Sequence, residues 1–181
     1  MEEDIGNKIH DLAKSLWKLP RSITGYGVEE TLRIIKKLIP DLKIINIASG
    51  ERVFDWEIPR QWHVNAAYII TPEGEKICDF SDNNLHLVGY STPFEGILCL
   101  ADLKNHLFYN EEQPDAIPYV TSYYEDRWGF CLSYNQLQRL PEGFYKVVVD
   151  SELSDGSLTY GELILEGHSS EEIFISTYIC H

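Results

Sequence analysis

The spacing of apolar residues changes near residue 42, and this change constrains the fold more than any other feature of the chain. Before it, apolar side chains recur at helical intervals in two stretches, each closed by a proline. We expect one helix over residues 3–18 and a second from Val28 to Ile39, whose acidic first turn and basic last turn suit the helix dipole. After residue 42, short β-branched and alternating runs replace the helical spacing. The sequence therefore predicts a mixed α/β protein.

The middle of the chain is expected to be mostly β. Phe54, Trp56 and Ile58 alternate with acidic residues, and the turn Pro72-Glu73-Gly74 separates two strand-like runs. Ser133 and Gln136 have the spacing of a capping box and predict a short helix, while Asp155-Gly156 is typical of a hairpin turn. Another short helix is expected at 101–108, and strands are expected at 42–47, 54–58, 67–71, 76–80, 85–91, 97–100, 119–123, 144–150, 158–165 and 173–180.

This order of elements indicates a discontinuous organisation. Residues 1–49 and 142–181 would form one α/β core of two helices and several strands. Residues 50–141 would form a mostly β domain inserted into it.

The net charge and the cysteine content restrict the classes of partner and the cellular compartment that we expect. The chain has 15 Lys and Arg against 29 Asp and Glu, a net charge of −14, which disfavours nucleic acid and anionic membranes as partners. Its start is acidic and amphipathic, without the basic end and apolar run of a signal peptide, and no stretch reaches transmembrane length. The 4 cysteines show no CxxC pairing. We expect a cytoplasmic protein without disulfides.

Seven stretches spread over almost the whole chain carry a more specific signal. They are LPRSITGYGVEETL (19–32), FDWEIPRQW (54–62), NNLHLVGYSTP (83–93), PDAIPYVTSYY (114–124), WGFCLS (128–133), DGSLTYGE (155–162) and EIFISTYICH (172–181). In this order they resemble a bacterial family of aminopeptidase-like proteins related to the two-zinc aminopeptidases and glutamate carboxypeptidases. The resemblance implies the N-terminal portion of a zinc-aminopeptidase-like core, interrupted by a family-specific β domain.

The last residues carry the main candidate for a metal ligand. The run Ile173–Cys180 predicts a buried strand that brings His181 to its carboxyl end, where ligands bind in open α/β sheets. The resemblance implies that His181 is the first zinc ligand, with the general-base Glu and the remaining ligands in sequence that would follow it. Zinc needs at least three protein ligands, so we expect this truncated chain to be inactive by itself. The expected function is that of the N-terminal part of a zinc-dependent hydrolase. The alternative to the ligand role is that His181 is a solvated residue at a frayed chain end.

A second reading is a non-catalytic β module that binds a carbohydrate or a peptide. His86 alternates with apolar neighbours and could face a cleft, or could be a structural residue. Tyr124 and Trp128 flank a charged turn and could stack on a sugar ring, although such an aromatic group also suits the core of a β domain. The substrate would be a small molecule, a peptide or a glycan. Because a truncated sheet exposes an unpaired edge, self-association is expected through the final strand or the β domain.

Overall fold

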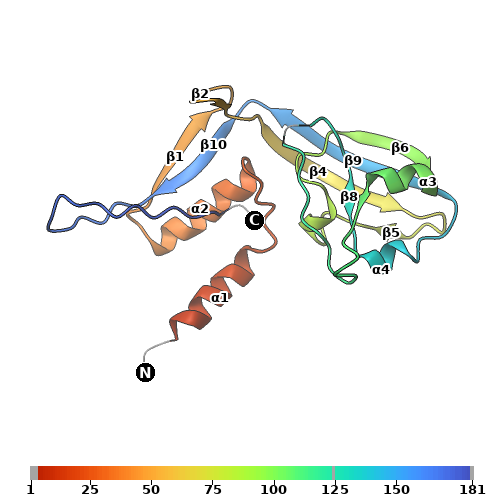
Figure 1. The fold of residues 1–181 in the computed structure, drawn as a ribbon, viewed down its shortest axis with the longest axis horizontal. Coiled ribbons are helices and arrows are strands. Elements are labelled where there is room, and N and C mark those ends of the chain that lie inside the picture. The colour runs from red at the N-terminus through yellow and green to blue at the C-terminus, as the bar shows by residue number, and fades with distance from the viewer. Residues whose placement is uncertain (1–3, 124, 180–181) are drawn as a thin grey trace. The chain divides into compact units, whose positions relative to one another are not determined.

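The computed structural model describes residues 4–123 and 125–179, which divide into two compact units (Figure 1). The first unit contains the described residues up to 61 and those from 155 onward, and the second contains residues 62–154. Four α-helices and four small sheets occur in the part of the chain that is described, so the predicted mixed α/β class is confirmed. None of the described helices is long and apolar enough to cross a membrane.

Two helices open the first unit, as the apolar spacing predicts. Helix α1 spans Ile5–Leu16, and the Asp4 carboxylate caps it by accepting a hydrogen bond from the Gly6 N–H at 3.0 Å. Helix α2 spans Tyr26–Leu38. Its buried face meets the strand that follows in one apolar cluster, formed by Val28, Leu32 and Leu42 with Ile35, Ile44 and Ile179 packed against them.

The sheet of the first unit joins distant parts of the chain. Strand β1 (Lys43–Ala48) runs antiparallel to β10 (Ser157–Glu162), with Lys43 opposite Glu162 and Ala48 opposite Ser157. A side chain at Gly161 would place its Cβ 2.9 Å from Leu32 Cδ2, so α2 approaches the sheet closely because this residue is glycine.

The strand predicted at 54–58 is confirmed only at Trp56–Glu57. Strands β2 (Arg52–Val53) and β3 (Trp56–Glu57) instead pair as a short hairpin. Phe54 lies in its turn with φ 58° and a side chain that is 99% exposed. An alternating pattern this short is satisfied equally by two strands folded back on each other.

A four-stranded sheet forms the centre of the second unit. Its order is β5 (Lys76–Ile77), β4 (Gln61–Ile70), β9 (Phe144–Ser154) and β6 (Phe94–Cys99). Alternate residues of β9 face the core, where Tyr145, Val147 and Val149 are buried. Beside the sheet lie the parallel strands β7 (Leu107–Phe108) and β8 (Phe130–Cys131), and four short helical segments: η1 (Asn84–His86), α3 (Leu100–Leu103), η2 (Lys104–His106) and α4 (Tyr134–Leu137).

Two further strand predictions and one hairpin prediction fail. Residues 85–91 and 119–123 form no named strand, although the isolated bridges Leu87 with Phe130 and Gly89 with Thr121 connect these regions to their neighbours. Asp155-Gly156 does not close a hairpin, because β9 pairs within the second unit while β10 pairs with β1.

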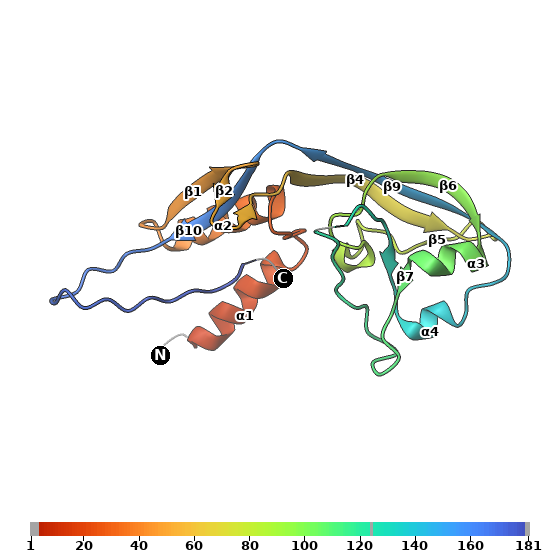
Figure 2. The ribbon, with the colours of Figure 1, turned by 45° about the horizontal axis from the view of Figure 1, so that its top comes forward.

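The final segment also differs from its prediction. Residues 163–179 have no helix or strand (Figure 2), and Ile173, Phe174 and Ile175 are 92%, 90% and 82% exposed. An extended segment becomes a strand only where a neighbouring strand takes up its backbone N–H and C=O groups, and no described strand does so here. His181 and Cys180 lie outside the described residues.

Candidate functional site

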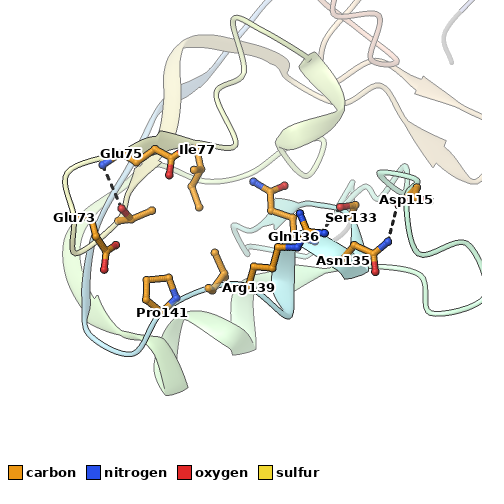
Figure 3. Close-up of a pocket in the computed structure, with 11 residues that line it drawn as sticks. Glu73, Glu75, Ile77, Asp115, Ser133, Asn135, Gln136, Arg139 and Pro141 are labelled. Atoms are coloured by element: carbon orange, nitrogen blue, oxygen red, sulfur yellow. Dashed lines mark hydrogen bonds between the residues drawn. The ribbon is translucent and has the colours of Figure 1, made fainter.

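A pocket of about 300 Å³ opens in the second unit between the β4–β5 turn and α4 (Figure 3). Its size is at the lower end of the range for small-molecule sites. It is lined by Thr71, Glu73, Glu75, Ile77, Asp115, Ser133, Asn135, Gln136, Arg139, Leu140 and Pro141.

The turn between β4 and β5 fixes one side of the pocket. The Thr71 N–H donates to the Glu75 carbonyl at 2.8 Å, and the Gly74 N–H donates to the Thr71 carbonyl at 2.9 Å. The Thr71 hydroxyl also accepts from the Glu75 N–H at 3.2 Å. Gly74 has φ +85°, a conformation that favours glycine. The backbone that carries Glu73 and Glu75 is therefore held by a closed set of hydrogen bonds.

Helix α4 and its flanks form the other side. The Ser133 hydroxyl accepts from the Gln136 N–H at 3.1 Å, which confirms the N-cap predicted from the sequence. The Asn135 amide donates to Asp115 Oδ1 at 2.7 Å, and the Asn135 N–H donates to the Pro114 carbonyl at 3.0 Å. These contacts tie α4 to the loop that carries Asp115.

The lining is acidic and has unused hydrogen-bonding capacity. Glu73, Glu75 and Asp115 face a single cation, Arg139. Among residues 4–123 and 125–179, no side-chain hydrogen bond or ion pair engages the side chains of Glu73, Glu75, Gln136 or Arg139. In Figure 3, Glu73 lies on one side of the pocket and Gln136 and Arg139 on the other. The pocket thus contains hydrogen-bond acceptors and donors without side-chain partners in the described part of the chain, and both kinds of group line the same cavity.

His86 is a structural link in the second unit. Its Nδ1 lies 2.8 Å from the Cys131 carbonyl oxygen, and because a carbonyl can only accept, Nδ1 carries the proton. The imidazole is half-buried and does not line the pocket.

Trp128 is held in an aromatic stack. The centroid of its ring lies 4.2 Å from that of Phe94 and 3.8 Å from that of His106, with interplanar angles of 19° and 6°. Two rings this close to one centroid would overlap if they shared a face, so they cover opposite faces. The His106 Nδ1 also contacts the Trp128 carbonyl at 3.2 Å. Neither face of Trp128 is open to a sugar ring, and its neighbour Phe130 is 0% exposed.

The other two candidate residues are not placed. Tyr124 and His181 lie outside the described residues. In the part that is described, no three His, Cys, Asp or Glu side chains gather in a way that could hold a metal ion. These residues alone therefore do not fit a zinc site.

The pocket itself has sequence signals, but they did not identify it as a site. The turn Pro72-Glu73-Gly74 and the Ser133 capping box were each predicted as local features. Their meeting depends on the packing of β4, β5 and α4, which no local pattern encodes.

Residues 61–152 match the family described as a domain of unknown function (DUF2172), and the chain belongs to this family.

A curated relative from Clostridium acetobutylicum is named "putative polysaccharide biosynthesis protein with aminopeptidase-like domain". It is 46% identical over 178 residues, which cover 98% of this chain and 41% of the relative. A crystal structure of a "putative peptidase" from the same organism matches with a TM-score of 0.83 at 46% identity, over 87% of this chain and 37% of that one. The chain thus spans less than half the length of either protein.

Proposed function

We propose that this chain is the N-terminal part of a metal-dependent, aminopeptidase-like hydrolase, with the second unit inserted into the hydrolase core. The observation that carries the proposal is the 46% identity, over nearly the whole chain, to a relative whose name includes an aminopeptidase-like domain. The matching structure named as a peptidase supports the same class. The substrate class is a peptide or another small molecule with a carbonyl that water can attack.

The exposed apolar side chains of the first unit support a larger core. Ile173, Phe174, Ile175 and Tyr178 are each more than 80% exposed, whereas Ile179 packs against the α2 cluster. Contiguous apolar residues exposed to this degree mark a surface that another part of a protein covers. In the proposed enzyme, residues 173–179 pair as a strand with chain that follows them.

The proposed metal is zinc, and the proposed ligand from this chain is His181. A neutral imidazole nitrogen would supply one bond, and the remaining ligands would come from residues beyond those described. When bound, zinc would acidify a water molecule for attack on the substrate carbonyl.

The test is to read the gene beyond His181, produce the whole product, and measure its zinc content and its hydrolysis of aminoacyl p-nitroanilides. We expect about one or two zinc ions per chain. His181→Ala should lower both zinc content and activity. His168→Ala is the matched control, because His168 is an exposed imidazole in the same segment, and it should change neither. A gene that ends at His181, or a whole product without zinc and without hydrolysis, would refute the proposal.

A further inference from the structure

We propose that the pocket between the β4–β5 turn and α4 binds an amino sugar, a hydroxyl-rich cation of monosaccharide size. This inference goes beyond the hydrolase proposal and does not rest on it, since it uses only residues of the second unit.

The charge of the lining selects a cation. Glu73, Glu75 and Asp115 place three carboxylates around the pocket against the one guanidinium of Arg139. Ligands that carry phosphate or carboxylate groups would meet net repulsion, whereas an ammonium group can donate charge-assisted hydrogen bonds to the glutamate carboxylates.

The hydrogen-bonding groups of the pocket lining favour a ligand that carries hydroxyl groups as well as a positive charge. Glu73 and Glu75 can only accept when ionised, Arg139 can only donate, and the Gln136 amide can do both. An ammonium group donates but never accepts, so it cannot use the donors of Gln136 and Arg139. Hydroxyl groups donate and accept, and a sugar ring carries them in several directions. Ile77, Leu140 and Pro141 offer apolar contact to the C–H groups of such a ring.

The size of the pocket and its fixed backbone also suit a ligand of one sugar ring. A pocket of about 300 Å³ suits a ligand of one sugar ring and is too small for a long oligosaccharide. The Thr71–Glu75 and Ser133–Gln136 hydrogen bonds hold the backbone on the two sides. The backbone is therefore fixed before a ligand binds, whereas the exposed side chains of Glu73, Glu75 and Arg139 become ordered only when they bind it.

The first experiment titrates the chain with glucosamine and follows the side-chain amide signals of Asn135 and Gln136 by ¹⁵N NMR. We expect saturable shifts at both amides. Glucose lacks the ammonium group and alaninamide lacks the hydroxyls, and each should bind about tenfold more weakly than glucosamine. Alaninamide binding as tightly as glucosamine would overturn the inference, because the pocket would then recognise an amine alone. Absence of saturable shifts with glucosamine would also overturn it.

The second experiment compares variants. Glu73→Gln combined with Glu75→Gln removes two charges without changing side-chain size, and should weaken glucosamine binding about tenfold. Glu152→Gln removes an exposed carboxylate of β9 that does not line the pocket, and should bind like the unaltered chain. Unchanged backbone spectra away from the pocket would verify the fold. Equal affinity in the double variant and the control would contradict the proposed site.

Discussion

Two buried thiols of the second unit have raised pKa values. Burial raises the pKa of Cys78 from 9.0 to about 12, with a further contribution from the charge of Cys131, and burial raises the pKa of Cys131 to about 12. Cys99 is half-exposed, and all three are free thiols.

These raised pKa values make stability depend on pH. Below pH 9 both thiols are neutral in the folded and unfolded states, so their contribution is fully present. Between about pH 9 and 12 only the unfolded chain ionises them, and the free energy of unfolding should fall by about 1 kcal/mol per pH unit for each thiol. Cys78→Ala and Cys131→Ala should each flatten this fall in urea unfolding measured at pH 8, 9.5 and 11 under reducing conditions. Cys99→Ala is the control and should leave the slope unchanged; an equal effect from all three would contradict the assignment.

At the scale of elements, the entry into α2 depends on a close backbone approach. A Cβ at Gly27 would lie 2.1 Å from the Pro20 carbonyl oxygen and 2.5 Å from its carbon. These are backbone atoms, which cannot move aside as a flexible side chain can. The start of α2 is therefore packed against the backbone of the residues that connect it to α1.

Gly27→Ala should destabilise the first unit by about 2 kcal/mol or more, even though alanine favours helix by about 1 kcal/mol over glycine. The measurement is hydrogen exchange of the α2 amides together with urea unfolding. Gly167→Ala is the matched control, because its Cβ would meet no atom within 4 Å and its φ is not positive. Should Gly27→Ala prove as stable as Gly167→Ala, the close approach would not constrain α2.

Local patterns predicted the elements whose packing is local. The helical spacing gave α1 and α2 to within a few residues, and the Ser133 capping box gave the start of α4. Local patterns did not predict which strands pair with each other. Asp155-Gly156 has good turn chemistry, yet β10 pairs with β1, and Thr159 Oγ1 donates to Asn46 Oδ1 across 113 residues. Turn chemistry allows a hairpin, but the pairing is decided by the whole core.

The segment around Ser91 shows why another strand prediction failed. Tyr90 has φ 63° and is 5% exposed, so the backbone bends sharply inside the core. The Ser91 carbonyl accepts from Trp62 Nε1 at 3.0 Å and from the Ser151 hydroxyl at 2.7 Å. These contacts come from strands far away in sequence and satisfy the Ser91 carbonyl, which a ladder would otherwise use. The same reason explains why the pocket was not predicted. Local patterns predict the turn on one side and the helix on the other, but not that the two pack close together.

At the scale of the whole molecule, the excess of acidic residues sets the response to salt. A net charge of −14 on 181 residues repels itself in the compact state more than in the expanded one. The Debye length falls from about 30 Å at 0.01 M salt to about 8 Å at 0.15 M, so added salt screens this repulsion. Ion pairs among the described residues are mostly exposed, and salt costs them little because such pairs contribute at most about 1 kcal/mol each.

The midpoint of thermal unfolding should therefore rise by a few degrees between 10 and 150 mM sodium chloride, with most of the rise at the low end. Glu111→Lys combined with Glu112→Lys reverses two exposed charges in a loop and should reduce the rise. Gln113→Ala, in the same exposed loop, alters no charge and should keep the rise in full. A midpoint that falls with salt would mean that ion pairs outweigh net repulsion. A rise of the same size in the double variant would mean that net charge does not cause it. The same excess of negative charge predicts no binding of duplex DNA at 150 mM salt, because binding requires cations that neutralise phosphates.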